Sequence, residues 1–488
     1  MKLLYEKSVP GRRAVRWPED PAVEDIALPA NLRRGHPAAL PELSEVEVVR
    51  HFTGLSKLNF SVDTHFYPLG SCTMKYNPKA CEAAAALPGL VDLHPLWPQL
   101  RTGGLLTQGA LNILYDLERM LSEITGMAEF TLQPLAGAHG ELTGVMLIAA
   151  YHRDRGNRKT HILIPDSAHG TNPASAAIAG YEVITVPSDP SGNMDVEAFG
   201  RAINEETAGV MMTSPSTLGL FVANSREIAE RVHAVDGLMY YDGANLNAIL
   251  GRCKPAQMGF DVCHLNLHKT FATPHGGGGP GAGPVGVVEK LTPYLPISRV
   301  VKQSDGAFAL DYGAPKSIGY IAPFYGNFGV LIRAYAYLLM IGREGLREVS
   351  NLAVLNANYL QEKLRPHFEA VARGRCLHEC VFSGKPFAPH GVHTLDLAKG
   401  LIDRGFHPPT VYFPLNVPEA IMIEPTETET RETLDDFART MIELAELART
   451  DPDALHRAPV TTPVGRLDEV AAARKMDLAA PISSAPLE

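Results

Sequence analysis

The sequence predicts an α/β fold: a mostly parallel, doubly wound sheet followed by a smaller C-terminal α/β domain. Three observations lead to this prediction. From Thr107 to Leu267, short apolar runs alternate with helical patterns, as in parallel strands joined by crossover helices. Small or polar residues follow these strands, where ligands of such sheets bind. The chain also has 488 residues, more than one ordinary domain, and a second, shorter alternation begins at about residue 376.

The composition fits a large globular protein and argues against several other classes. The net charge of −10 argues against a general nucleic-acid binder. Six cysteines in so long a chain do not make a disulfide framework and favour a reduced, cytoplasmic setting. Cys376 and Cys380, with His378 between them, form at most half of a zinc site, so no metal is expected. No run of 18 uncharged apolar residues predicts a membrane span, and the common phosphate-loop, zinc-protease and serine-hydrolase motifs are missing.

Residues 1–105 are interrupted by prolines and predict an extended N-terminal arm. Only short helical runs such as Glu42–Leu55 occur in it. An arm with few strands has little core of its own, so we expect it to lie on another surface, in its own chain or in a partner. Within the arm, the small and hydroxyl residues of Pro68–Pro78 suit a tight loop, whose role the residues leave open.

Residues 106–328 predict the large, cofactor-binding domain. Leu111, Leu114, Leu117 and Leu121 recur at helical spacing, and Gly126 ends that helix. The predicted strands are Glu129–Leu135, His161–Pro165, Glu182–Pro187, Gly209–Thr213, Leu238–Tyr241 and Val262–Leu267. The predicted helices between them are Gly140–Arg153, Pro173–Gly180 and segments around Asp195–Glu205 and Arg226–Val235.

Residues 329–450 predict a linking helix and a small C-terminal domain. The long helical stretch is Val330–Lys363, and Thr426 and Glu429 have the spacing of a capping box before the last helix. The small domain is predicted from strand Cys376–Phe382, helix Thr394–Arg404, strand Ala420–Glu424 and helix Arg431–Leu447. Residues 451–488 are a Pro/Ala-rich tail that either docks or is mobile.

Small or polar residues capable of binding or catalysis follow five of the strands. Because the carboxyl ends of parallel strands meet at one edge of a sheet, we expect these residues to form one ligand site. The five segments are Ala136–Gly140, Asp166–Thr171, Ser214–Thr217, Asp242–Ala244 and His268–Lys269.

Lys269 follows a buried strand and precedes the glycine-rich segment that runs to Gly283. An ammonium group is costly to desolvate, so such a lysine is either ion-paired or has a lowered pKa. A lowered pKa favours imine formation, since only the neutral amine attacks a carbonyl. The glycines let backbone approach a ligand or another chain closely. The alternative interpretation is a surface lysine before a flexible loop.

Three other strand ends complement this lysine. Gly137–Gly140 leads into a helix whose start can bind an anion, His169 can stack on an aromatic ring, and Asp242 can pair with a protonated pyridine nitrogen. Taken singly, each has an ordinary alternative: a strand–helix turn, a hydrogen-bonded structural histidine and a turn cap. Together with Lys269, which lies 27 residues after Asp242, they describe a site for pyridoxal 5'-phosphate.

Four longer motifs make the resemblance specific. They are His264–Phe271, Pro274–Gly281, Pro68–Asn77 and Glu424–Glu429. These motifs resemble those of glycine dehydrogenase (decarboxylating), the P-protein of the glycine cleavage system, among the fold-type I pyridoxal-phosphate enzymes. The resemblance runs from about Asp63 to Leu447. Larger members of that family have about twice this length and two homologous halves, so the chain resembles the lysine-bearing half, subunit 2 of the split form.

The resemblance implies pyridoxal-phosphate-dependent decarboxylation of glycine, an oxidoreductase activity. Lys269 would hold the cofactor as an imine (a Schiff base) and, once freed, shuttle a proton. His169 would stack on the ring and Asp242 would bind its nitrogen. After CO2 departs, the aminomethyl group would pass to the lipoyl disulfide of a carrier, the H-protein. The other implied cofactor contacts are the phosphate-cradling backbone of Ala138 and His139, with Thr217, His268 and Ala244.

The implied partners are glycine dehydrogenase subunit 1, in a hetero-oligomer with two copies of each subunit, and the lipoylated H-protein. No nucleic acid or membrane partner is expected, and the chain is expected to be inactive alone. Two alternatives stay open: another fold-type I amino-acid lyase, and a non-catalytic subunit of the same fold. The presence of Lys269 argues against the second.

Overall fold

The computed structural model of the protein describes residues 2–16, 28–36, 38–95, 105–276, 279, 281–323 and 325–477. Contacts divide the chain into two compact units, Met1–Ser61 with Arg466–Glu488, and Val62–Gly465. The second unit contains both main sheets and every predicted site residue. Residues 62–95 of the expected arm therefore belong to the second unit, while the predicted boundaries near residues 105, 328 and 450 stay predictions.

The first unit contains the expected helix near residue 50, α1 (Glu45–Ser56). Ser44 and Glu47 form a capping box at its start, in which the Ser44 N–H donates to Glu47 Oε2 at 3.0 Å. Exposed apolar side chains recur along α1 at every third position, namely Val46, Val49, Phe52 and Leu55. The other elements of this unit are 3₁₀ turns at Tyr5–Lys7 and Ala30–Leu32 and the helix α13 (Glu469–Arg474).

The second unit is built on a seven-stranded sheet with the order β1-β7-β6-β5-β4-β2-β3. Its strands are β1 (Glu129–Thr131), β2 (His161–Pro165), β3 (Glu182–Val186), β4 (Thr207–Thr213), β5 (Leu238–Gly243), β6 (Val262–Leu265) and β7 (Val285–Val287). All neighbours pair in parallel except β7, which is antiparallel to both β1 and β6. The predicted α/β class with a mostly parallel sheet is confirmed. The sequence did not reveal β7, because this strand has three residues in a Gly/Pro-rich segment.

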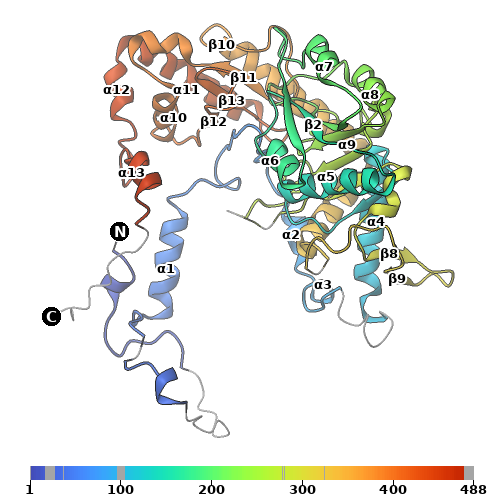
Figure 1. Ribbon diagram of the computed structural model, residues 1–488. Helices are drawn as coiled ribbons and strands as arrows, with labels where there is room; N and C mark the ends of the chain where they lie inside the picture. Colours follow the sequence, from blue (N-terminus) through green and yellow to red (C-terminus); the bar gives the residue numbers. More distant parts are fainter. Residues whose placement is uncertain are drawn as a thin grey trace. The chain divides into compact units, whose positions relative to one another are not determined.

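Helices cover both faces of this sheet (Figure 1), and successive side chains of β5 accordingly pack in two different clusters. Leu238 and Tyr240 pack in the cluster that includes α5 (Gly137–Asp154), whereas Met239 and Tyr241 pack in the cluster that includes α8 (Ser225–Ala234). The helix before β1, α4 (Gln108–Thr125), ends at Gly126 in the left-handed conformation, as expected. The remaining helices between the strands are α6 (Thr171–Ile178) and α7 (Val196–Ala202).

The long helix α9 (Phe328–Leu364) leads to the small antiparallel sheet β10-β11-β13-β12 and is kinked at Gly342, whose φ is 62°. The strands of this sheet are β10 (Glu369–Ala370), β11 (Cys380–Ser383), β12 (Thr410–Val411) and β13 (Ala420–Ile423). It packs with α10 (Thr394–Ile402), α11 (Arg431–Thr450) and α12 (Pro452–Arg457). The two helices and two central strands predicted here are therefore present.

Two local predictions in this region are wrong. The N-cap of α11 is Thr430, whose hydroxyl accepts from the Thr433 N–H, so Thr426 and Glu429 do not form the predicted capping box. The strand predicted from Cys376 begins only at Cys380. Residues 376–379 are not part of the small sheet. The Leu377 N–H instead donates to the carbonyl of Gly219, in the loop after β4.

Residues 62–95 contact several other elements of the second unit. Leu69 makes an isolated bridge with Ile423 of β13. Glu82 in α2 (Lys79–Ala85) pairs with Arg333 of α9 at 2.7 Å. The remaining elements of this unit are α3 (Pro88–Val91), the hairpin β8 (Arg299–Lys302) and β9 (Phe308–Asp311), and 3₁₀ turns at Leu105–Thr107, Pro255–Met258, Glu289–Tyr294 and Lys385–His390.

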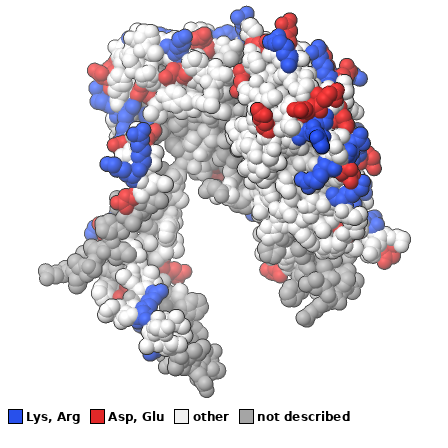
Figure 2. All heavy atoms as spheres, viewed as in Figure 1, with Lys and Arg blue, Asp and Glu red and all other residues white. Residues whose placement is uncertain are grey.

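The surface of the second unit carries charges of both signs. On the face drawn in Figure 2, acidic and basic side chains are interspersed, so this face has no large patch of one charge of the kind that attracts polyanions. None of the helices that the structure describes combines the length and the apolar character needed to cross a membrane.

Candidate active site

A cavity of about 290 Å³ opens at the carboxyl ends of the parallel strands. Seven of the eight predicted site residues line it: Ala138, His169, Thr217, Asp242, Ala244, His268 and Lys269. The structure does not place the eighth, His139, on its wall; the ring Nδ1 of His139 accepts from the Leu135 N–H at 3.2 Å. A larger cleft of about 730 Å³ lies against α4 and β8 and contains none of the eight, so the smaller cavity is the site the sequence predicted.

Lys269 lies in the turn that follows β6, half-buried on the cavity wall. Its Nζ donates to the carbonyl oxygen of Ser71 at 2.6 Å. Among the described residues that line the cavity, Lys269 is the only lysine or arginine. The glycine-rich segment after it approaches closely, as at Gly281, where a Cβ would lie 3.3 Å from the His268 ring. Gly277 and Gly278 of the predicted glycine run lie outside the described residues.

Asp242 lies near the end of β5, where its side chain is buried and accepts three hydrogen bonds. Asn172 Nδ2 donates to Oδ2 at 3.0 Å, Thr213 Oγ1 donates to Oδ2 at 3.2 Å, and the Ala244 N–H donates to Oδ1 at 3.0 Å. Burial acts to raise the pKa of Asp242, but His264 and these hydrogen bonds lower it overall. A carboxylate has about four lone-pair sites, so Asp242 can accept one more donor from the cavity.

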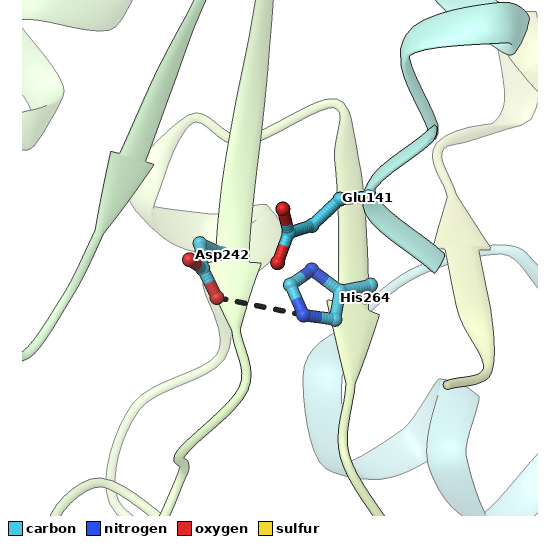
Figure 3. Close-up of side chains that lie close together, drawn as sticks. All are labelled: Glu141, Asp242 and His264. Carbon is cyan, nitrogen blue, oxygen red and sulfur yellow. Dashed lines mark ion pairs between the residues drawn. The ribbon is translucent and has the colours of Figure 1, made fainter. Parts of the chain in front are cut away.

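His264 and Glu141 lie beside Asp242 (Figure 3), and Glu141 also lines the cavity. Tyr240 OH lies 2.7 Å from His264 Nδ1, and burial lowers the pKa of His264 to about 4. Because burial raises the pKa of Tyr240 well above its ordinary value, the phenol donates, and the neutral imidazole carries its proton on Nε2. That nitrogen faces Asp242 Oδ1 at 3.5 Å, so a polar N–H rather than a full positive charge supports the carboxylate at neutral pH.

Glu141 projects from the first turns of α5 and stays largely protonated at neutral pH. Burial, and then the neighbouring charge of Asp242, raise its pKa to about 8. Thr171 Oγ1 donates to its Oε1 at 2.9 Å, while Oε2 is buried with no partner among the described residues. A neutral carboxyl here avoids placing two negative charges side by side.

The start of α5 forms another wall of the cavity through Gly137 and Ala138. The first N–H groups of a helix have no partner within the helix and attract anions. A Cβ at Gly137 would lie 2.6 Å from Asn266 Oδ1, so the backbone approaches Asn266 more closely than any other residue type allows. Thr217 lies across the cavity, with its hydroxyl donating to the Ser167 carbonyl at 2.6 Å.

Histidines provide much of the remaining wall. The Nδ1 of His169 lies 2.8 Å from Thr171 Oγ1, and desolvation lowers the pKa of this ring. Burial, followed by the neighbouring His275 and Lys269, lowers the pKa of His268 to about 3. The His268 and His275 rings meet edge to face at 5.1 Å. These histidines are therefore neutral at neutral pH and can stack or exchange hydrogen bonds without adding charge.

The sequence did not identify the wall formed by the Pro68–Pro78 loop and the small domain. Ser71, Cys72, His378 and Glu379 all line the cavity. Ser71 has a φ of 65°, which is strained for a residue with a side chain. Its carbonyl accepts from Lys269 while its N–H donates to Glu379 Oε2 at 2.8 Å. Because Ser71 and Glu379 lie 308 positions apart in the sequence, local patterns give no signal of this contact, and the sequence left the role of the loop open.

Comparisons with known proteins agree with this geometry. Residues 349–457 match the family model described as glycine dehydrogenase, C-terminal domain, and residues 140–279 match that of aminotransferase class-V. A protein named probable glycine dehydrogenase (decarboxylating) subunit 2 from Caldanaerobacter subterraneus subsp. tengcongensis is 56% identical over 97% of this chain and 97% of its own. A protein of the same name from Bacillus licheniformis is 54% identical, with the same coverage of both chains.

Two solved structures with this fold have much lower sequence identity to this chain. A glycine decarboxylase (P-protein) of the glycine cleavage system, in inhibitor-bound form, superposes with a TM-score of 0.71 at 22% identity, covering 86% of this chain and 93% of that one. The sphingosine-1-phosphate lyase Bpss2021 of Burkholderia pseudomallei gives a TM-score of 0.61 at 15% identity, covering 88% of this chain and 94% of that one. At these identities the likeness concerns the fold alone.

Proposed function

The chain belongs to the family of glycine dehydrogenase (decarboxylating) subunit 2, and from this premise we propose that the cavity around Lys269 is its active site. The reaction is the pyridoxal-phosphate-dependent decarboxylation of glycine in the glycine cleavage system. The observation that carries the assignment is the pairing of one lysine with a buried, hydrogen-bonded aspartate, Asp242, in a single cavity at the carboxyl edge of the sheet.

The residues of the cavity fit pyridoxal phosphate. Lys269 Nζ offers the amine for covalent attachment, and Asp242 retains room for one more donor, which suits a protonated ring nitrogen. The N–H groups at the start of α5 offer an anion site for the phosphate, beside the hydroxyl of Thr217. When bound, this cofactor supplies the electron sink that accommodates the electron pair left when CO2 departs.

The side chains of the chain itself would orient the substrate and handle protons. Asp242 stays ionised because three donors satisfy it, and this charge keeps a partner nitrogen protonated. The neutral His169 ring would stack on an aromatic face from the α6 side. Lys269 is held by the Ser71 carbonyl and, when free, can move a proton between its Nζ and the substrate carbon. Ala138, Ala244 and His268 complete the proposed contacts, while His139 would contribute only its backbone.

We further propose that the chain works with subunit 1, in a hetero-oligomer with two copies of each subunit, and passes the aminomethyl group to the lipoyl arm of the H-protein. The names of the relatives as subunit 2 support a companion subunit. The exposed apolar side chains of α1, Val46, Val49, Phe52 and Leu55, suit burial against such a partner. Phe52→Asp should weaken co-purification with subunit 1, and Arg50→Asp, on the same exposed helix, should not.

The activity is tested by exchange of labelled CO2 with glycine. The purified chain, subunit 1, pyridoxal phosphate and lipoylated carrier together should catalyse the exchange, and the chain with carrier alone should not. Lys269→Ala should abolish it, whereas Lys254→Ala, at a surface site outside the cavity, should leave it unchanged. Formation of an amino-acid cleavage product without CO2 would instead favour a lyase of the same fold. Full exchange without subunit 1 would show that the companion is dispensable.

A further inference from the structure

Two buried carboxyl groups face each other beside the cavity, at the ends of neighbouring strands. Cys380 of β11 pairs with Ile423 of β13, so Glu379, just before β11, lies opposite Glu424, just after β13. One oxygen of each carboxyl group and one nitrogen of His378 lie within 4.8 Å of one another. Glu379 is 2% exposed and Glu424 is 0% exposed. Two unscreened like charges at this separation are strongly unfavourable, so the pair holds a proton.

The hydrogen bonds assign the negative charge to Glu424. Its Oε1 accepts from Thr73 Oγ1 at 2.6 Å, Asn245 Nδ2 at 2.8 Å and Asn247 Nδ2 at 2.9 Å, and its Oε2 accepts from the Thr73 N–H at 3.2 Å. So many donors stabilise an ionised carboxylate and leave it little capacity to bind a metal ion.

Glu379 is the protonated member of the pair. Its Oε2 accepts a single hydrogen bond, from the Ser71 N–H at 2.8 Å. Burial, and then the charge of Glu424, raise the pKa of Glu379 well above its ordinary value, outweighing the opposite effects of Ser71 and Lys269. Burial lowers the pKa of the adjacent His378, so this ring is neutral and does not neutralise the pair.

The proton on Glu379 lies at the reaction cavity rather than in the core. Glu379 and His378 both line the cavity that contains Lys269. One peptide unit joins the acid to the lysine, since Ser71 donates its N–H to Glu379 and accepts from Lys269 Nζ through its carbonyl. The Nδ1 of His378 is buried with no partner among the described residues, so this wall also has a free polar atom for a ligand.

We propose that Glu379 is a further catalytic residue, the general acid that protonates the sulfur released when the lipoyl disulfide is opened. The proposal rests on the proposed function. In this step the carbon derived from glycine forms a bond to one sulfur, the bond between the sulfurs breaks, and its electron pair goes to the second sulfur. The proton of Glu379 converts that thiolate to a thiol. Glu379 becomes a carboxylate and is reprotonated from solvent or from the ammonium of Lys269.

The test separates carbon–carbon cleavage from sulfur protonation. Glu379→Gln keeps the size of the side chain and an acceptor for the Ser71 N–H but cannot deliver a proton. In the complex with subunit 1, pyridoxal phosphate and lipoylated carrier, this variant should form thiol on the carrier about 100-fold more slowly or worse. Its exchange of labelled CO2 with glycine and its cofactor absorption should change little. Glu429→Gln is the matched control, because burial raises the pKa of Glu429 to about 7 although it does not line the cavity.

A second readout needs neither cofactor nor carrier. The infrared spectrum of the folded full-length chain at neutral pH should contain the carbonyl band of a protonated carboxyl that Glu379→Gln removes and Glu429→Gln leaves in place. The proposal would be overturned if no such band is present. It would also be overturned if Glu379→Gln forms thiol at the wild-type rate, or if this variant loses CO2 exchange and thiol formation equally. A wild-type complex that performs no CO2 exchange would instead contradict the proposed function. The infrared spectrum would still show whether Glu379 is protonated, because it does not depend on that activity.

If Glu379→Gln does not fold, the pH dependence of the wild-type complex decides the matter. A general acid acts only when protonated, so thiol formation should fall as the pH rises through the pKa of Glu379, while CO2 exchange should not follow it. The groups that face Glu379 are Glu424 just after β13, Lys269, His378 and Cys72 in the Pro68–Pro78 loop. Parallel pH profiles for the two measurements would overturn the proposal.

Discussion

Replacing Asp242 by asparagine should impair turnover far more than cofactor binding. Asp242→Asn keeps the size of the side chain and one acceptor oxygen but removes the negative charge that would hold the ring nitrogen protonated. The three donors around Asp242 stay in place, from Asn172, Thr213 and Ala244. The altered interaction is a hydrogen bond to a charged group, worth about 1.5–3 kcal/mol. If this free energy is lost from the stabilisation of the transition state, the reaction becomes roughly 10- to 150-fold slower.

The assay is CO2 release per bound cofactor, with the cofactor quantified by visible absorption. Binding should persist because Lys269 and the start of α5 are unaltered. Asp261→Asn is a suitable control. Asp261 is also buried, interacts with His233 and Lys290 at 2.7 Å each, and lies outside the cavity. This control should lose stability while retaining turnover per folded molecule. Unchanged CO2 release in Asp242→Asn would refute the assigned role.

Three further predictions concern other parts of the second unit. Gly137→Ala should weaken cofactor binding measured by absorption titration, because its Cβ would lie 2.6 Å from Asn266 Oδ1, whereas Gly109→Ala in α4, with no atom within 4 Å of its Cβ, should not. The pKa of Glu141 is about 8 in the folded chain, against an ordinary value of 4.5, so between these pH values the folded state binds more protons than the unfolded state. The free energy of unfolding should therefore fall as the pH rises from 4.5 to about 8. Glu141→Gln should reduce this fall in a series of denaturation measurements at different pH. Lys75→Ala should lower the free energy of unfolding by about 3–5 kcal/mol in urea, because it leaves Glu427 buried without its 2.6 Å partner, whereas Lys79→Ala, in an exposed pair, should cost far less.

The sheet and its ligand edge could be predicted because both follow from local patterns. Five short apolar runs and their polar ends located β2, β3, β4, β5 and β6 to within two residues. The ends of those strands converge because parallel pairing fixes their register, for example Asp242 beside His264. Position in the chain and chemistry therefore sufficed to predict that Lys269 and Asp242 lie in one cavity.

The loop wall of the site could not be predicted from the same patterns. The contact between Ser71 and Glu379 joins residues far apart in the sequence and depends on how the small domain packs. The strained φ of Ser71 and the proton on Glu379 arise only from that packing. The direction of the His139 ring, whose Nδ1 accepts from the Leu135 N–H, likewise depends on how the helix enters. The backbone contact of His139 with phosphate stays a prediction.

The most direct test of the central claim is the identity of the lysine that holds the cofactor. The chain, assembled with subunit 1 and pyridoxal phosphate, would be reduced with borohydride, digested and mapped by mass spectrometry. A pyridoxyl adduct on the peptide containing Lys269, lost in Lys269→Ala while Lys254→Ala retains it, is the result that the structure predicts. An adduct on any other lysine of the folded chain, or full decarboxylation by Lys269→Ala, would contradict the assignment of the cavity as the active site.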